Sequence, residues 1–247
     1  MKAIALYAIK GGVGKTAACV NLAHLAAKEG HKTLVIDLDP QGAASFYFRI
    51  RPGKKLSSKT VVKGGRKVDK NIKGTDFENL DLLPSTMSFR NLDIFLNNTK
   101  TPKKIVRSML RPFQSEYDYV FLDCPPNITL VSENIFRAAD ILLVPVIPTT
   151  LSKLALDKLV GFFEKRKLPV EKITGFFSMV ERRKILHKEL LMEISSATTR
   201  MLKTIIPYSS DVEKMGIHRA PLASFASSSK AAKAYEALWE EIKMSLS

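Results

Sequence analysis

The chain has 247 residues, 45% of them hydrophobic, and a formal net charge of +15. This apolar share is ordinary for a globular protein, and no apolar stretch approaches the ~20 residues needed to span a bilayer, which argues against a membrane-spanning protein. The two cysteines, Cys19 and Cys124, are too few for a disulfide framework and suit a reducing compartment. The excess of positive charge favours association with a polyanion, either nucleic acid or an anionic membrane.

Short apolar runs alternate with helical patterns along the chain, which is typical of a doubly wound α/β fold: a mostly parallel sheet with helices on both faces. The expected strands are 2–9, 33–37, 79–83, 118–123, 140–145, 173–178 and 203–206. The expected helices are 15–29, 42–48, 88–97, 101–115, 129–138, 151–167, 183–199 and 228–245. No repeat, linker or signal-peptide pattern interrupts them, so one domain over 1–247 is predicted.

A glycine-rich run, KGGVGKT from Lys10 to Thr16, joins the first expected strand to the first expected helix. Such a turn presents backbone N–H groups to a phosphate, and the helix N-terminus adds positive potential. Lys15 is placed to reach the β- and γ-phosphates of a nucleotide, and the Thr16 hydroxyl to bind Mg²⁺. The usual spacing, G-x-x-x-x-G-K-[ST], requires glycine at position 9, but this chain has Ile9 followed directly by a second lysine, Lys10.

Three carboxylates follow expected strands. Asp37 and Asp39 leave the end of the second strand, and Asp123 closes the apolar run 118–123. The carboxyl edge of an open α/β sheet is where ligands bind. An acid at the end of a buried strand has little structural use without a cation, so the pattern predicts a Mg²⁺ site.

Three motifs resemble those of the ParA/MinD/Soj group of P-loop ATPases. The run from Lys10 to Thr16 is similar to the group's deviant Walker A motif. The run LVIDLDPQG, 34–42, resembles its D-x-D-P-Q-G segment, and YVFLDCPP, 119–126, resembles its Walker B strand with a D-[AC]-P-P end. The motifs occur in the family's order, and the likeness extends from the first strand to the last helix. The D-x-D-P-Q-G segment points to ParA/Soj partition ATPases more than to MinD.

The resemblance implies a cytoplasmic, nucleoid-associated ATPase that uses ATP and Mg²⁺. Two ATP-bound subunits form a sandwich homodimer, bind non-specific DNA, and are released by hydrolysis that a ParB-like or cargo-adaptor protein stimulates. The cycle would position a plasmid, a chromosome or another cargo.

The resemblance also assigns roles within the site. Lys10, Lys15 and Asp39 would be catalytic: Lys10 reaches the partner subunit's nucleotide and Asp39 helps to position the attacking water. The alternative is that Lys10 contacts the phosphates of its own subunit. Thr16, Asp37 and Asp123 would hold the metal. The expected nucleotide contacts are Lys10, Gly11, Gly12, Val13, Gly14, Lys15, Thr16, Ala17, and, beside the adenine, Pro207 and Tyr208.

Basic residues gather in two parts of the chain. Segment 49–73 has ten of them and one acid, Asp69, and is predicted to be an exposed basic excursion such as a loose hairpin, either contacting DNA or a partner or merely solvated. The expected late DNA contacts are Arg182, Arg183, Lys184, Lys203, Lys214 and Arg219, with Lys188 and Arg200 nearby. The stretch from Asp211 to Lys214 has an acid about where many relatives have a DNA-contacting arginine, so the resemblance allows a DNA surface displaced towards Lys214 or segment 49–73.

Two rival functions remain at this point: a MinD-like membrane-cycling regulator, and a nucleotide-gated scaffold with negligible hydrolysis. The last expected helix bears on the first rival. It has Tyr235, Leu238, Trp239, Ile242 and Leu246 at helical spacing, and its polar face is acidic near the end. Anionic lipid would repel such a face, so core packing is predicted and stable membrane association is not.

Overall fold

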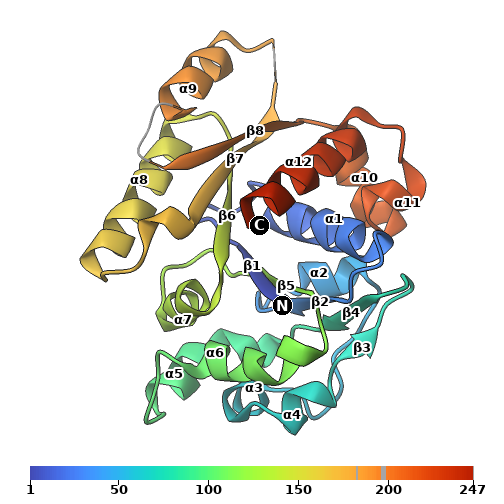
Figure 1. Ribbon diagram of the computed structural model, residues 1–247, viewed down its shortest axis with the longest axis vertical. Coiled ribbons are helices and arrows are strands. Elements are labelled where there is room, and N and C mark those ends of the chain that lie inside the picture. The colour runs from blue at the N-terminus through green and yellow to red at the C-terminus, as the bar shows by residue number, and fades with distance from the viewer. Residues whose placement is uncertain (182, 196–198, 247) are drawn as a thin grey trace.

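The computed structural model describes residues 1–181, 183–195 and 199–246, and its strands form one eight-stranded sheet (Figure 1). In spatial order the strands are β3 (Lys73–Gly74), β4 (Leu80–Leu83), β2 (Thr33–Asp37), β5 (Tyr119–Asp123), β1 (Lys2–Leu6), β6 (Ile141–Val146), β7 (Ile173–Val180) and β8 (Arg200–Pro207). Every pairing is parallel except β3 with β4. The predicted doubly wound, mostly parallel α/β fold is therefore confirmed.

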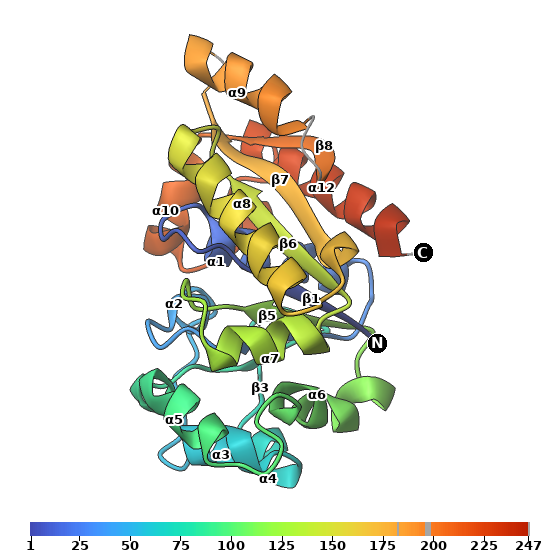
Figure 2. The same ribbon diagram turned by 90° about the vertical axis from the view of Figure 1, so that its left-hand side faces the viewer.

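Helices cover both faces of this sheet (Figure 2). The α-helices are α1 (Lys15–Lys28), α2 (Ala43–Tyr47), α3 (Ser58–Lys63), α4 (Arg66–Asp69), α5 (Leu92–Asn97), α6 (Ile105–Leu110), α7 (Leu130–Ala138), α8 (Thr150–Lys165), α9 (Ile185–Ser195), α10 (Ser210–His218), α11 (Leu222–Phe225) and α12 (Lys230–Leu246). Short 3₁₀ helices are η1 (Met87–Asn91), η2 (Arg111–Ser115) and η3 (Val170–Lys172).

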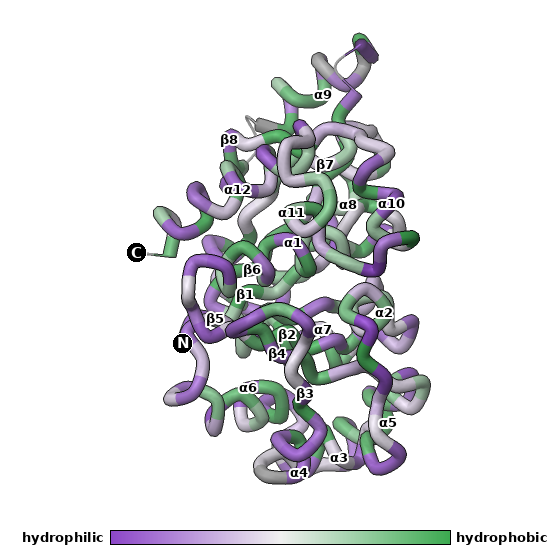
Figure 3. Tube along the Cα trace, turned by 90° about the vertical axis from the view of Figure 1, so that its right-hand side faces the viewer, coloured by the Kyte–Doolittle hydropathy of each residue, from purple (hydrophilic) through white to green (hydrophobic). Residues whose placement is uncertain are grey.

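The sheet separates two hydrophobic cores, because successive side chains of a strand point to opposite faces. In β1, Ala3 and Ala5 join the core under α3 to α8, whereas Ile4 and Leu6 join the core under α1 and α12. Strands buried on both sides must be apolar throughout, and β1, β2 and β5 are mostly hydrophobic in Figure 3. This arrangement fixes the carboxyl edge of the central strands, where the candidate site lies.

The C-terminal helix packs into the second core, as predicted. Tyr235, Leu238, Trp239 and Ile242 are buried, and Leu246 is partly buried against the same cluster. The indole Nε1 of Trp239 donates to Glu29 Oε2 at 3.0 Å, which ties α12 to the end of α1. The apolar face of α12 is thus used for packing. In the described residues, no helix is long and apolar enough to cross a membrane.

Segment 49–73 differs from the prediction of a loose hairpin without core residues. Part of it forms α3 and α4, and Leu56, Val61 and Val68 are buried in the first core. Ser57 caps α3 by accepting from the Thr60 N–H, and lysines occupy the exposed positions. These apolar residues help to dock α3 against α5 and α6, and the count of charged residues in the segment did not reveal this packing.

Several other boundaries also differ. The first strand ends at Leu6 rather than at residue 9, and β8 starts at Arg200 rather than at residue 203. The helix expected over 183–199 is observed as α9, and its residues 196–198 lie outside the described residues. The expected helices 88–97 and 101–115 are each divided between an α-helix and a 3₁₀ helix. The edge strand β3 and helices α10 and α11 were not predicted. Gly216 lowers the helix propensity of α10, whereas Pro221 is the N-cap of α11, a position where proline breaks no intrahelical hydrogen bond.

Candidate nucleotide and magnesium site

The glycine-rich loop lies between β1 and α1, and its backbone needs glycine at two positions. Gly12 and Gly14 have φ of 72° and 92°, in the left-handed region that side chains disfavour. Gly14 is the N-cap of α1, and a Cβ there would lie 3.0 Å from Ser178 Oγ. The loop therefore turns tightly into the helix, and its amides lie at the positive end of α1, which is the arrangement that binds phosphate.

Lys15, the first residue of α1, is a buried cation. Its exposed fraction is only 7%, and within the described part of the chain it forms no ion pair. Burying a charge is costly unless an opposite charge compensates it. An anion at the loop would supply that compensation.

Asp37 and Asp123 are neighbours across β2 and β5, and both are fully buried. Asp37 Oδ2 accepts hydrogen bonds from the Ser45 N–H at 2.8 Å and the Ser45 hydroxyl at 2.7 Å. Asp37 Oδ1 and both carboxylate oxygens of Asp123 are buried without a hydrogen-bond partner among the described residues. Buried polar atoms are nearly always satisfied in folded proteins, so three orphaned oxygens mark a place for a ligand.

The two carboxyl groups have perturbed pKa values for the same physical reason. Burial raises the pKa of Asp37 to about 6, with the Asp39 charge adding to the effect and the Ser45 hydrogen bonds opposing it. Burial, and then the charge of Asp37, raises the pKa of Asp123 well above its ordinary range, against the effect of the Thr16 hydroxyl and Lys15. A divalent cation between the two acids would favour their ionised forms.

These residues fit a magnesium ion held partly by a nucleotide. Thr16, Asp37 and Asp123 offer one hydroxyl and two carboxylates, and no group of three or more His, Cys, Asp or Glu in the described residues is arranged around a metal. Mg²⁺ commonly binds through one or two carboxylates together with water and substrate phosphates. The donor set is therefore adequate for Mg²⁺ but not for a structural metal such as zinc.

Asp39 lies at the open side of the site. It is partly exposed, its Oδ1 accepts from the Gln41 N–H at 3.0 Å, and its backbone carbonyl accepts from Ser85 Oγ. It lines a cleft of about 390 Å³ together with Pro125 and Pro126 of the D-C-P-P segment. A carboxylate in this position is accessible to water, unlike Asp37.

Ser45 and Ser85 belong to the site, although the sequence did not identify them. Ser45, in α2, donates twice to Asp37 and accepts from the Ser85 N–H at 2.8 Å. Both serines are buried. The signal was weak: a serine three residues after Gly42, at the start of a short helix that follows the acidic segment.

Replacing Ser45 by alanine is expected to lower the free energy of unfolding by about 1–3 kcal/mol, because it leaves the Ser85 N–H and one carboxylate oxygen without a side-chain partner. It should also raise the pKa of Asp37 further, since these hydrogen bonds favour the ionised form. Urea denaturation at pH 7 measures the change. Ser228→Ala, at an exposed loop serine, is the matched control; equal midpoints for the two variants would contradict the assignment.

The predicted adenine contacts lie next to the loop. Pro207 ends β8, Tyr208 follows it, and both line a small cavity of about 40 Å³ that also touches Gly14, Ser178 and Met179. The Tyr208 ring is half-exposed, and its hydroxyl donates to Glu213 Oε1 at 2.7 Å. The chain thus brings residues 14 and 207–208 together, and their contact with a base stays a prediction.

Lys10 is partly exposed and lies beside Val144 and Pro145 at the start of the loop. Among the other expected nucleotide contacts, Gly11 and Gly12 are exposed, Val13 and Ala17 are buried, and Thr16 is intermediate. An exposed lysine at the loop remains available to a second molecule.

Three of the predicted DNA-contacting residues have intramolecular partners among the described residues. Lys184 pairs with Glu181, and Lys214 with Asp211 at 3.1 Å. Arg219 lies over the Phe46 ring at 4.6 Å and donates to the Phe46 carbonyl, so it holds α10 against α2. The exposed residues Arg183 and Lys203 form no ion pair within the described chain, and Arg182 lies outside the described residues.

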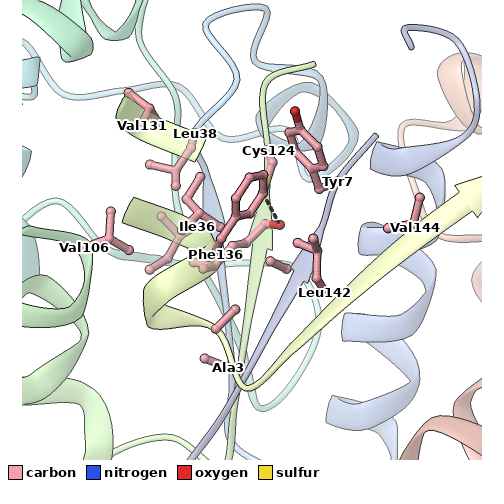
Figure 4. Packing of buried hydrophobic residues seen from close by; sticks show 14 of the residues in the cluster. Ala3, Tyr7, Ile36, Leu38, Val106, Cys124, Val131, Phe136, Leu142 and Val144 are labelled. Carbon is pink, nitrogen blue, oxygen red and sulfur yellow. Dashed lines mark hydrogen bonds between the residues drawn. The ribbon is translucent and has the colours of Figure 1, made fainter. Parts of the chain in front are cut away.

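The two cysteines are buried and unpaired, as expected for core residues. Figure 4 shows Cys124 among Ile36, Phe136 and Leu142, and its thiol donates to the Leu122 carbonyl at 3.4 Å. Burial raises the pKa of the Cys19 and Cys124 thiols well above the ordinary value, so both stay protonated. They are packing residues here.

Comparison with known proteins agrees with this geometry. Residues 1–173 match the model of an AAA domain family. The chain is 29% identical to the sporulation initiation inhibitor protein Soj of Bacillus subtilis, over 98% of each chain. It superimposes with a TM-score of 0.81 on a putative plasmid partition protein from Borrelia burgdorferi bound to AMPPNP, at 25% identity and 99% coverage of both chains.

The same fold also occurs in a cobyrinic acid a,c-diamide synthase from Mycobacterium smegmatis with bound ADP and magnesium, with a TM-score of 0.80 at 20% identity. That likeness concerns the fold alone, because one fold can host different chemistry.

The fold and the glycine loop beside two buried carboxylates define a P-loop nucleoside triphosphatase. The family model that matches residues 1–173 and the similar Soj proteins narrow this class of nucleoside triphosphatases further. The chain belongs to the AAA domain family, as a P-loop ATPase of the ParA/MinD group.

Proposed function

We propose that the protein is a cytoplasmic ParA-like ATPase that hydrolyses ATP with Mg²⁺ to position a DNA molecule or another cargo. The observation that carries the proposal is the set of oxygens of Asp37 and Asp123 that lack a hydrogen-bond partner among the described residues, together with the nearby buried Lys15, which forms no ion pair there. The site thus holds carboxylates and an ammonium group close together, without an ion-pair partner for either among the described residues. Magnesium with a triphosphate would satisfy both at once.

The residues present can perform the tasks that phosphoryl transfer to water requires. The loop amides and Lys15 would fix the phosphates, while Thr16, Asp37 and Asp123 would hold Mg²⁺, which neutralises developing charge. Asp39, partly exposed at the same edge, would accept a hydrogen bond from the attacking water and orient it. Burial of Lys15 strengthens its electrostatic effect, because less solvent screens it.

Lys10 would act across a homodimer interface. It is partly exposed at the loop, so in a face-to-face dimer it can add a cation to the partner subunit's phosphates. Hydrolysis would then depend on assembly, as with an arginine finger. Dimers would bind DNA non-specifically through phosphate contacts, and a ParB-like or adaptor protein would stimulate hydrolysis and release. Relatives described as a chromosome-partitioning ATPase and a chromosome partitioning protein support a role in partitioning.

Opposite effects are expected from substitutions at Lys10 and Asp39. Lys10→Ala should bind ATP but lose hydrolysis and the sandwich dimer. Asp39→Ala should retain ATP and accumulate as a dimer that does not turn over. Sedimentation velocity with saturating ATP, paired with phosphate release, measures both. A monomeric Asp39→Ala protein at saturating ATP would refute the scheme, and normal dimers of Lys10→Ala would place Lys10 in its own subunit.

The proposed function is tested by single-turnover ATP hydrolysis together with DNA binding. A measurable hydrolysis step supports an ATPase, and its absence in the presence of DNA and partner protein would favour the scaffold alternative. ATP-dependent binding to anionic liposomes would favour a MinD-like regulator. The burial of Tyr235, Leu238 and Trp239 in the core argues against that outcome, since the apolar face of α12 is already covered.

A further inference from the structure

A cleft of about 710 Å³ lies between α6, the last turn of α7 and the segment joining α8 to β7. Seven of its eleven described lining residues are lysine or arginine, and none is acidic. Its volume is typical of a small-molecule site. A concave surface with one sign of charge focuses its field on anions.

The cleft is remote from the glycine loop. The loop follows the carboxyl end of β1, whereas α7 ends at Ala138 just before β6 begins, and η3 immediately precedes β7. The cleft therefore lies at the amino edge of the sheet, and α6 and α7 lie on the side away from α1 and α12 (Figures 1 and 2). A ligand in it would not touch the nucleotide site.

The positive charges in the cleft are only partly compensated. In the described part of the chain, Lys104, Arg107, Arg111 and Lys167 form no ion pair. Burial and then the neighbouring charge of Arg107 lower the pKa of Lys172, against the opposing effect of Asp140 and Glu171. Cations held this close in a hollow repel one another, and an anion would remove that repulsion.

One side of the cleft is already organised. Glu133 is a buried carboxylate in α7, and it pairs with Arg137 at 2.8 Å and Lys103 at 3.2 Å. The Nε atom of Arg137 is nevertheless buried without a hydrogen-bond partner among the described residues. Arg166 also lies 4.0 Å from Glu133, so this carboxylate holds three cations in place, while the Nε donor of Arg137 has no partner among the described residues.

Lys167 is in a conformation that normally favours glycine. Its φ is 52°, at the end of α8, where its N–H donates to the Glu164 carbonyl. Left-handed residues after a helix are usually glycine, because a Cβ is disfavoured there. A lysine in this position places a cation at the cleft at some cost to the backbone.

We propose that this cleft is a second phosphate-binding site, for a ligand that carries several linked phosphates. Arginine forks and lysine ammonium groups match phosphate oxygens in geometry and charge. The volume suits a short run of phosphate groups, supplied either by a free oligophosphate, whose phosphates share oxygens, or by a single nucleic-acid strand, whose phosphates are joined through sugars. The inference does not depend on the ATPase function proposed above.

The test is calorimetric titration with inorganic tripolyphosphate in the Lys15→Ala variant, which isolates the cleft from the glycine loop. One remaining site is expected, weakened about tenfold or more by adding Arg107→Glu and Arg111→Glu. The matched control, Lys230→Glu with Lys233→Glu, makes the same charge change at exposed positions of α12 and should leave affinity within about twofold. Absence of binding, or equal loss in both double variants, would overturn the proposal.

Two further arms sharpen the result. The Lys167→Gly variant should bind tripolyphosphate more weakly, while its thermal unfolding midpoint stays equal or rises. Weaker binding together with lower stability would show that Lys167 is merely structural and would count against its part in the site. Displacement of tripolyphosphate by a 12-nucleotide single strand would assign the phosphates to nucleic acid, and no displacement to a free oligophosphate; both support the site. If the wild type and Lys15→Ala each show one identical site, the glycine-loop assignment fails and the cleft stands.

Discussion

Lys15→Ala is expected to weaken ATP–Mg²⁺ binding by about 100-fold, because it deletes a charge-assisted contact to the phosphates from a site that excludes water. Lys15 is 7% exposed, so solvent cannot replace the lost ammonium. Isothermal titration calorimetry with ATP and Mg²⁺ measures the effect directly.

Lys28→Ala is the control, since Lys28 is an exposed lysine in the last turn of the same helix, α1. It removes the same charge at the far end of the helix and should leave ATP affinity unchanged. Equal affinity of wild type and Lys15→Ala would remove the basis for a nucleotide site at the loop.

DNA binding is expected to fall about 10³-fold when salt rises from about 50 to about 200 mM, if ~6 phosphates are contacted. Contacts to phosphate carry no sequence information, so affinity should be similar for unrelated sequences. ATP should strengthen binding, because a dimer engages two copies of each basic surface at once. Fluorescence anisotropy with two unrelated duplexes, with and without ATP, measures all three effects.

Charge changes should locate the DNA surface. Arg183→Glu with Lys203→Glu tests the late residues, and Lys63→Gln with Lys67→Gln tests helices α3 and α4, where neighbouring lysines lower the pKa of Lys63. Neither pair should change ATP affinity, and Lys230→Glu with Lys233→Glu is again the control. Strong sequence preference, or binding indifferent to both salt and ATP, would contradict the mechanism.

The central fold and the loop were predictable from sequence because local signals and tertiary demands agree there. The apolar run before Lys10 must be a buried strand, and the glycines permit the φ values that the turn requires. Asp37 and Asp123 were recognisable because each ends such a strand. The two residues are neighbours because β2 and β5 pair in a particular register. The two motifs place both residues at strand ends but do not specify that register.

Other features were hidden because no local pattern encodes them. Ser45 contacts Asp37 only because α2 packs beside the end of β2. A single serine in the sequence does not indicate this contact. Arg219 resembled a DNA contact by charge, but its guanidinium packs on Phe46, which is distant in sequence. The lysines and arginines of the cleft come from α6, α7 and the end of α8, so no single stretch of the sequence contains them.

The distribution of charge also gives the molecule an electrical polarity. Segment 49–73 has ten basic residues and one acid, and residues 99–114 have five basic residues and no acid. Helices α3, α4 and α6 from these segments lie together at one end of the molecule in Figures 1 and 2. An uneven charge distribution orients a protein in the electric field of an approaching polyanion, so this end would meet the polyanion first. In an encounter with a polyanion, the apoprotein alone would therefore already set the orientation.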